Sequence, residues 1–317
     1  MTETMRINYK EYPEYMFAII AAYLPESEGD DLRLLAGSVV FRHENKYGHT
    51  YKNGLLHSYH DKPAYLYPNG QQWYKDGKIH REGDKPAYVY GNTQQWYKNG
   101  VLHRDDDLPA VINGDNHEWY QNGELHRDND RPAVINGQIQ IWYKNGNRHR
   151  DGDKPSYIDG KYNEEWYQNG HLHREGDLPA VIKGNSHYWY KNGKLYRDKD
   201  KPCVIIARNR FEWHKDGVLH RDNDLPAVIY RDIQEWYING KRHRDGDKPA
   251  LITAHHQTWY KDGKIHRDHD NPAIIYGKTL HWYKDGKYHR DGDKPAYISD
   301  HSEIFYKDGI LVKSCYK

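Results

Sequence analysis

The chain has 317 residues, of which 30 are Tyr and 10 are Trp but only 4 are Phe, and its 47 Lys and Arg nearly balance its 46 Asp and Glu. The formal net charge of +1 argues against a nucleic-acid binder with a strongly basic surface, and 2 Cys exclude a disulfide scaffold or a cysteine-rich zinc module. The aromatic content of 14% is too high for a disordered chain. No apolar run reaches the roughly 18 residues of a membrane-spanning helix. Because residues 1–10 lack a signal-peptide pattern, we expect a cytoplasmic protein, in the host cytoplasm or the virion if it is viral.

Residues 1–45 differ in composition from the rest of the chain and predict a small helical segment. The apolar run 15–24 contains good helix formers and ends at Pro25, and residues 31–36 predict a second short helix. An array of β-repeats exposes a sheet edge at its end, so a helical pair at this place can act as a cap.

The residue order in this segment resembles an F-box, a family with Leu-Pro, then Ile-x-x-Tyr-Leu-Pro, then Asp-Leu followed by Leu, Val and an aromatic residue. The matching residues are Pro13, Ile20, Tyr23, Leu24, Pro25, Asp31, Leu32, Leu35, Val39 and Phe41, while Tyr12 stands where the family prefers Leu. The resemblance implies docking to the adaptor subunit of an SCF-type ubiquitin ligase. The residues it assigns to adaptor binding are Pro13, Ile20, Leu24, Pro25, Leu32 and Leu35. A helical cap without a partner is the alternative.

From residue 46 to the C-terminus the sequence is an internal repeat. The ten Trp follow one another at intervals of 23 or 24 residues: Trp73, Trp96, Trp119, Trp142, Trp166, Trp189, Trp213, Trp236, Trp259 and Trp282. Each begins a copy of W-Y-K-[N/D]-G-x-x-H-R-[D/E]-x-D-x-P-A-x-[I/V] with few departures. A fixed period of this length predicts about 11 stacked units and a truncated last copy.

One unit can be followed residue by residue. Asp-Gly between short β-prone runs favours a type I′ turn, so residues 76–77 place Tyr74 opposite Ile79 and Trp73 opposite His80. The loop 82–86 ends in Pro and interrupts the second strand, which resumes at residues 87–89. Each unit is expected to supply about two strands of an antiparallel meander. The predicted fold is mainly β, an elongated single-sheet antiparallel meander of 23-residue hairpin repeats with a small α-helical N-terminal cap.

The period and the Tyr-x-[N/D]-Gly element, as in residues 97–100 and 260–263, resemble MORN repeat proteins, whose units of about 23 residues are β-hairpins. The resemblance covers about 270 residues. The family has a His-Gly-x-Gly element where this chain has His-Arg-Asp-x-Asp-x-Pro. That variant is most similar to the long repeat proteins of large DNA viruses of amoebae.

Several residue groups that recur in the repeat resemble parts of known chemical sites. His-Arg-Asp recurs in unit after unit, as in residues 103–105, whereas a catalytic residue is needed once; the motifs that accompany it in kinases are absent. The repeated His residues, predicted to stack on Trp, lie two strands apart, about 9–10 Å, which is too far to share a metal ion. The second Asp of each loop is expected to cap a turn and pair with Arg of its own or the next unit, with a calcium site as the alternative. A row of Lys beside the turns is expected to be a solvated rim. We therefore expect no catalytic residue, no metal and no cofactor.

Residues that break the repeat are the better place to look for a specific site. Ser156 and Cys203 replace Ala, Tyr196 replaces His, His214 replaces Tyr, Ile238 replaces Lys, and the inter-unit turns are irregular at 208–211 and 253–256. Most of these departures fall between residues 196 and 256. The predicted partner-binding residues are Tyr196, Cys203, Arg208, Arg210, His214, His255 and His256.

These observations predict a non-enzymatic scaffold for protein–protein interaction. In its sharper form the F-box-like segment would recruit clients to a ubiquitin ligase. The alternatives are a structural component of a viral particle or cytoskeletal assembly, and a protein that binds a membrane surface.

Overall fold

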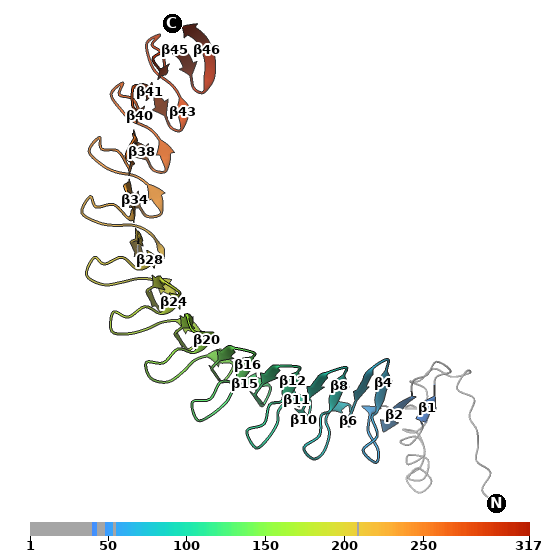
Figure 1. The fold of residues 1–317 in the computed structure, drawn as a ribbon. Helices are drawn as coiled ribbons and strands as arrows, with labels where there is room; N and C mark the ends of the chain where they lie inside the picture. The colour runs from blue at the N-terminus through green and yellow to red at the C-terminus, as the bar shows by residue number, and fades with distance from the viewer. Residues whose placement is uncertain (1–39, 43–47, 53–54, 208) are drawn as a thin grey trace, which may run out of the picture. The chain divides into compact units, whose positions relative to one another are not determined.

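The computed structural model describes residues 40–42, 48–52, 55–207 and 209–317 (Figure 1). These residues form short β-strands and no α-helix, which confirms the prediction of a mainly β protein. Among them no helix is long and apolar enough to cross a membrane. The predicted cap, apart from strand β1 (Val40–Arg42), and its boundary at residue 45 lie outside the described residues. The chain divides into two compact units, residues 1–148 and 149–317.

In the first unit the longer strands form an antiparallel meander in which each strand pairs with the next. Its strands are β4 (Tyr65–Tyr67), β5 (Gly70–Gln72), β8 (Tyr88–Tyr90), β9 (Thr93–Gln95), β12 (Val111–Asn113), β13 (Asn116–Glu118), β16 (Val134–Asn136) and β17 (Ile139–Ile141). Two-residue strands form separate hairpins between them: β6 (Tyr74–Lys75), β7 (Lys78–Ile79), β10 (Tyr97–Lys98), β11 (Val101–Leu102), β14 (Tyr120–Gln121), β15 (Glu124–Leu125), β18 (Tyr143–Lys144) and β19 (Asn147–Arg148). Strand β1 pairs with β2 (Gly48–Lys52), and β2 pairs with β3 (Leu55–Leu56).

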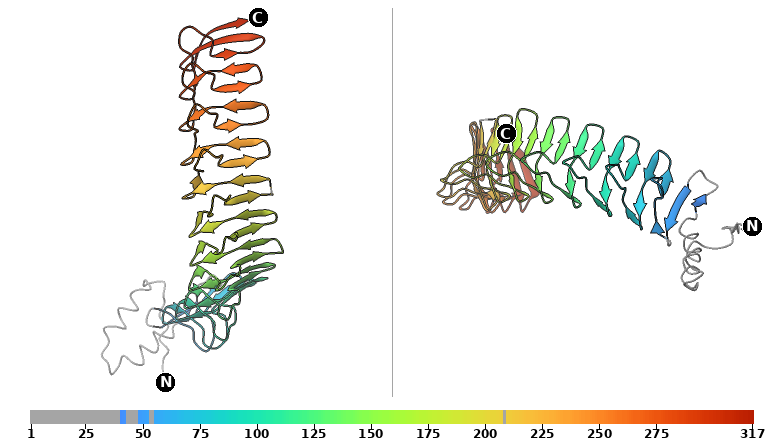
Figure 2. Two further views of the ribbon diagram at one scale, coloured as in Figure 1. Left: turned by 90° about the vertical axis from the view of Figure 1, so that its left-hand side faces the viewer. Right: turned by 90° about the horizontal axis from the view of Figure 1, so that it is seen from below.

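The second unit repeats this plan, and its strands lie side by side like rungs (Figure 2, left). Its meander contains β20 (Tyr157–Asp159), β21 (Asn163–Glu165), β24 (Val181–Lys183), β25 (Ser186–Tyr188), β28 (Val204–Ile206), β29 (Arg210–Glu212), β32 (Val228–Tyr230), β33 (Ile233–Glu235), β36 (Leu251–Ile252), β37 (His256–Thr258), β40 (Ile274–Tyr276), β41 (Thr279–His281), β44 (Tyr297–Ile298), β45 (Ser302–Lys307) and β46 (Ile310–Tyr316). The hairpins are β22 (Tyr167–Gln168) with β23 (His171–Leu172), β26 (Tyr190–Lys191) with β27 (Lys194–Leu195), β30 (His214–Lys215) with β31 (Val218–Leu219), β34 (Tyr237–Ile238) with β35 (Lys241–Arg242), β38 (Tyr260–Lys261) with β39 (Lys264–Ile265), and β42 (Tyr283–Lys284) with β43 (Lys287–Tyr288).

The predicted turn and its register are confirmed. Tyr74 pairs with Ile79, and Asp76 and Gly77 have φ of 48° and 79°, as a type I′ turn requires. Each repeat supplies two strands to the meander, as predicted, and two further short strands that form a separate hairpin, which the sequence did not predict. The Trp73 N–H donates to the Ala87 carbonyl at 2.8 Å, so residues before Trp73 join the meander and residues after it form the small hairpin.

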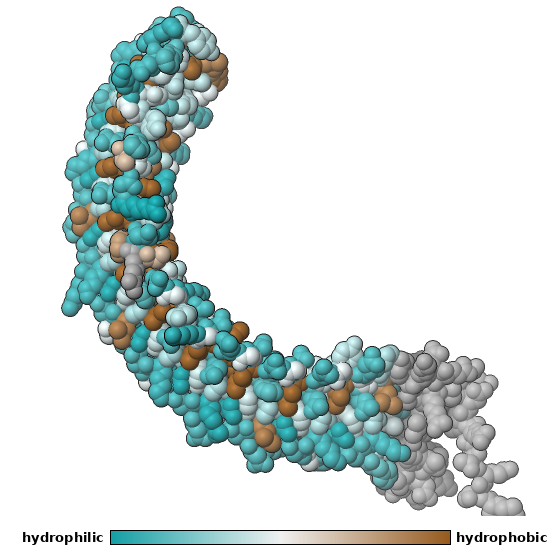
Figure 3. Space-filling view, in the orientation of Figure 1, coloured by the Kyte–Doolittle hydropathy of each residue, from teal (hydrophilic) through white to brown (hydrophobic). Residues whose placement is uncertain are grey.

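The core of each unit is thin. It consists of columns, in which equivalent side chains of successive repeats lie one after another. Trp is 4–8% exposed in nine of the ten repeats, and the Ala after each loop Pro is fully buried. Ser156 and Cys203 occupy this Ala position and are equally buried. On the surface, hydrophobic residues recur at intervals among hydrophilic ones in both units (Figure 3). This arrangement explains how a chain with a mean hydropathy of −1.15 folds without a deep core.

Candidate binding face formed by the repeat loops

Each repeat Trp lies between a buried Ala and the guanidinium of an Arg. The backbone N–H of Trp96 donates to the Ala110 carbonyl at 2.8 Å, and the Arg104 Cζ lies 3.7 Å from the centroid of the Trp96 ring. A cation over an indole face at this distance is attracted by the ring quadrupole. The ring partner of Trp is therefore Arg, not the His that alternation along one strand predicted. The same stacking occurs at Trp73, Trp119, Trp166, Trp189, Trp213, Trp236, Trp259 and Trp282.

The same Arg clamps the loop of the preceding repeat. Arg104 Nε and Nη2 donate to the two carboxylate oxygens of Asp84 at 2.6 and 2.7 Å, and its Nη1 donates to the Pro109 carbonyl at 3.1 Å. The guanidinium lowers the pKa of Asp84. The predicted Asp–Arg pairing is thus confirmed, and it joins successive repeats. Equivalent forks are Arg81–Asp61, Arg127–Asp107, Arg174–Asp153, Arg197–Asp177, Arg221–Asp200, Arg244–Asp224, Arg267–Asp247 and Arg290–Asp270.

The residue before the loop Pro determines whether the Asp of the Arg–Asp fork pairs with a second cation. We call this second ion pair a clip. Lys201 Nζ lies 2.5 Å from the Asp177 carboxylate, and with Arg197 it lowers the pKa of Asp177 to about 2. The equivalent clips are Lys85–Asp61, Arg131–Asp107, Lys248–Asp224 and Lys294–Asp270. Leu occupies this position at Leu108, Leu178 and Leu225, where it is 38–42% exposed and leaves the Asp to the Arg alone.

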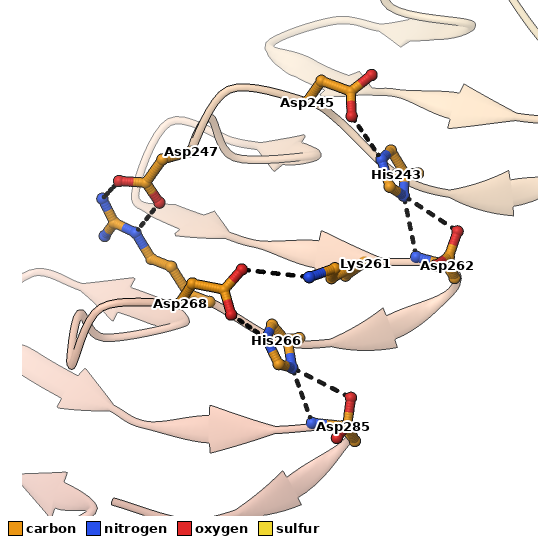
Figure 4. Close-up of polar contacts among 9 residues, drawn as sticks. His243, Asp245, Asp247, Lys261, Asp262, His266, Asp268 and Asp285 are labelled. Carbon is orange, nitrogen blue, oxygen red and sulfur yellow. Dashed lines mark hydrogen bonds and ion pairs between the residues drawn. The ribbon is translucent and has the colours of Figure 1, made fainter.

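The repeat His joins its own loop to the next hairpin, with one ring nitrogen on each. The Asn122 backbone N–H donates to His103 Nδ1 at 3.1 Å, so Nδ1 is the acceptor and the proton lies on Nε2, which bonds Asp105 at 2.9 Å. Lys98 also bonds Asp105, and together His103 and Lys98 lower its pKa. In the second unit His243 and His266 repeat this geometry, each between two Asp (Figure 4).

The loops project from one side of the strand row (Figure 1). Open clefts lie between successive loops. Equivalent residues line them: the His, Arg and acid of one or both loops together with the Trp, Tyr and following residue of the hairpin between them. The clefts at Trp73, Trp166, Trp236 and Trp259 have volumes of about 340, 460, 410 and 240 Å³. This repetition presents the same surface chemistry several times within a unit. Within the described ranges no group of three or more His, Cys, Asp or Glu could hold a metal ion.

The partner-binding residues predicted from the sequence do not converge on one site. Cys203 is 1% exposed in the Ala column, and burial raises the pKa of its thiol to about 11. Tyr196 is exposed in the His column and donates to Asp198. His255 is exposed at the opposite end of the strands, where His256 Nδ1 bonds the Thr253 hydroxyl.

The structure does bring Arg210 and His214 together. Arg210 Nε donates to one oxygen of Glu212 at 2.6 Å, and His214 Nε2 lies 3.1 Å from the other. The hydrogen bond from His214, followed by that from Arg210, lowers the pKa of Glu212, whose side chain is largely buried. Arg208 lies outside the described residues, as do the predicted adaptor-binding residues Pro13, Ile20, Leu24, Pro25, Leu32 and Leu35.

The sequence analysis did not predict the loop clefts. It also did not predict the ion pairs from the residue before Pro to the loop Asp, which are present at some clefts and absent at others. The signal was present in the repeat, because the residue before Pro is Lys or Arg in most repeats but Leu at residues 108, 178 and 225 and Asn at residue 271. No protein-family model matches the sequence, and no curated protein matches it significantly.

Proposed function

We propose that the protein is a non-enzymatic scaffold for protein–protein interaction, which uses the loop face of its repeats. The observation that supports this most is the recurrence of one cleft, with equivalent lining residues, between successive loops of both units. Repeats that share one surface chemistry suit an extended partner, because each repeat adds a contact of the same kind. The aromatic and Arg side chains of the clefts are types that contribute strongly to protein interfaces.

Site-specific photo-crosslinking in the native cell tests this proposal. A photoreactive residue is placed at Lys75 or Gln168, which line clefts of the first and second unit. Matched controls carry it at Asp115 or Asn185, exposed turn residues at the opposite end of the strands. We expect both cleft positions to give adducts with the same protein and the control positions to give none. Equal labelling from all four positions, or none from the clefts, would contradict the proposal.

We further propose that residues 13–35 recruit the adaptor subunit of an SCF-type ubiquitin ligase, which would make the repeats the client-binding part. The resemblance of Ile20 to Pro25 and of Asp31-Leu32 to an F-box supports this. The full chain should co-purify with the purified adaptor, and Leu24→Asp with Leu32→Asp should abolish co-purification. A chain that never binds the adaptor would leave the scaffold proposal standing and remove the ligase.

A further inference from the structure

The cleft between residues 149 and 178 differs from its neighbours in the second unit. Gln168 stands where Lys191 and Lys261 stand in other repeats, and Leu178 stands where Lys201 and Lys248 supply a clip. This cleft has therefore lost two cations of the repeat pattern. It is also the largest of the four clefts described above, at about 460 Å³, within the range of sites that bind small ligands.

Trp166, which lines this cleft, has a buried donor without an acceptor. Its side chain is 6% exposed, and its Nε1 is buried and has no hydrogen-bond partner. Among the described residues Trp96 Nε1 is in the same state, but the residue that follows its Tyr is Lys98, not a neutral Gln. In the repeat after Trp166, Trp189 Nε1 donates to the Asp177 carbonyl at 3.0 Å, and Trp259 Nε1 donates to the Asp247 carbonyl at 3.1 Å. By equivalence the indole N–H of Trp166 faces the loop 151–154, which is part of the cleft wall. A buried N–H that has lost its water and gained no acceptor is unfavourable, so an acceptor at this place would be favourable.

The loop that should supply the acceptor has a different backbone at this repeat. Asp177 and Asp247 have φ of 56° and 51°, whereas Asp153 does not have a positive φ. No Lys clips Asp153, because Leu178 occupies that position and is 42% exposed. Gly152 has φ of 74°, and a Cβ at this position would lie more than 4 Å from any neighbouring atom, as it would at Gly176.

The charges around the cleft already have partners. Arg174 forks to Asp153 at 2.6 and 3.0 Å and donates to the Pro179 carbonyl. His149 bonds Asp151 at 3.0 Å, and His173 bonds Glu175 at 2.9 Å. Arg150 and Lys154, the remaining charged groups of the lining, also have partners, and Arg150 donates to the Pro155 carbonyl at 3.0 Å. An anionic ligand would find no uncompensated cation, whereas the neutral amide of Gln168 can both donate and accept at the rim.

We propose that this cleft binds a neutral peptide segment of a partner protein, with one amide carbonyl accepting from Trp166 Nε1 and an aliphatic side chain packed on Leu178. The loop 151–154 hinges at Gly152 to admit the carbonyl, and Gln168 pairs with a second amide. This assignment rests on the proposed scaffold function and names the partner chemistry at one of its clefts.

The probe is N-acetyl-leucine methylamide, which carries two amides and one aliphatic side chain, added at millimolar concentration to the full chain labelled with ¹⁵N at Trp. We expect the indole N–H signal of Trp166, assigned with Trp166→Phe, to shift while that of Trp189 stays in place. Leu178→Lys should clip Asp153 as Lys201 clips Asp177 and weaken the response about tenfold or more. Leu225→Lys is the matched control, because Trp213 beside that loop already donates to the Asp200 carbonyl at 3.0 Å, so this variant should leave the Trp166 response unchanged.

A Trp166 signal that does not move, that moves together with all other indole signals, or that still moves in Leu178→Lys would overturn the peptide assignment. The other indole signals report in the same spectra whether each variant is folded. Crosslinks from Lys75 and Gln168 without a probe response would refute this cleft assignment alone. A probe response without crosslinks would refute the scaffold function and leave the cleft as a ligand site.

Discussion

At the scale of single residues, the Arg of each loop makes the most contacts: with a Trp ring, an Asp carboxylate and a Pro carbonyl. Arg127 stacks 3.7 Å from the Trp119 centroid, forks to Asp107 at 2.8 and 2.9 Å, and donates to the Pro132 carbonyl at 3.2 Å. It therefore orders its own loop and the preceding one at once. A Lys could keep the charge but could not make the two-pronged contact.

Arg127→Ala should lower the local free energy of opening by about 2–3 kcal/mol, because charge-assisted hydrogen bonds and the contact with Trp119 are lost together. Hydrogen exchange of the peptide spanning residues 119–133 measures this. Arg127→Lys should recover part of the loss, and an Ala variant as protected as the parent chain would disprove the role.

The two cysteines should differ sharply in reactivity. Cys203 is buried and burial raises its thiol pKa to about 11, so little reactive thiolate forms at neutral pH. Cys315 is partly exposed. In the native protein we expect maleimide to modify Cys315 and spare Cys203 until denaturant is added, as read by mass spectrometry. Cys203→Ala should fold normally, because Ala is the usual residue at this position, whereas Cys203→Leu should cost about 1–3 kcal/mol by overpacking.

At the scale of elements, local sequence rules were sufficient to predict each hairpin. They were not sufficient to predict the hydrogen bonds between residues far apart in the sequence. Asp76-Gly77 predicted the turn, the Tyr74–Ile79 pair and the period correctly. The split of each repeat into four strands depends on a bond from the Trp73 N–H to the Ala87 carbonyl, fourteen residues away, which no local pattern shows. The orphan indole of Trp166 depends on the path of one glycine loop, so it could not be predicted from the sequence either.

The left-handed turn conformation gives a prediction at this scale. Gly263 has φ of 85°, and a Cβ there would meet only ordinary contacts, the nearest 3.7 Å away on Lys241. Gly263→Ala should therefore destabilise the hairpin by backbone strain alone, by about 1–2 kcal/mol. Asp262→Asn, which recreates the Asn-Gly of residues 99–100, should be nearly neutral. Exchange protection of the Lys264–Ile265 amides measures both, and equal protection in the two variants would contradict the strain argument.

At the scale of the whole molecule, both units rely on the same carboxylate forks, so acid should loosen both. Asp177, Asp224 and Asp270 have pKa values lowered to about 2, first by the hydrogen bond from Arg and then by that from Lys. Their unfolded pKa is about 3.9, so the stability they contribute is present above about pH 4 and is lost as the pH falls toward 2.

Denaturant unfolding followed by Trp fluorescence should therefore show a midpoint that drops between pH 4 and pH 2. Lys201→Met, which removes one clip from Asp177, should be less stable than the parent chain at pH 7 and equally stable at pH 2. A deficit that persists unchanged at pH 2 would mean that Lys201 acts through packing rather than through charge.

The fork from each Arg to the Asp of the preceding loop makes a repeat a donor to one neighbour and an acceptor for the other, as Arg104 and Asp107 do in one repeat. Where two Trp are 24 residues apart, as at Trp142 and Trp166, the added residue falls in the turn between Asp159 and Asn163, away from the Trp. The length of the chain can therefore change by recombination. Deletion or duplication of one 23-residue repeat between equivalent positions leaves each remaining hydrogen-bonding group with an equivalent partner. We expect genes that encode this repeat to differ in length by whole repeats, and we expect single-residue insertions to be tolerated only in those turns.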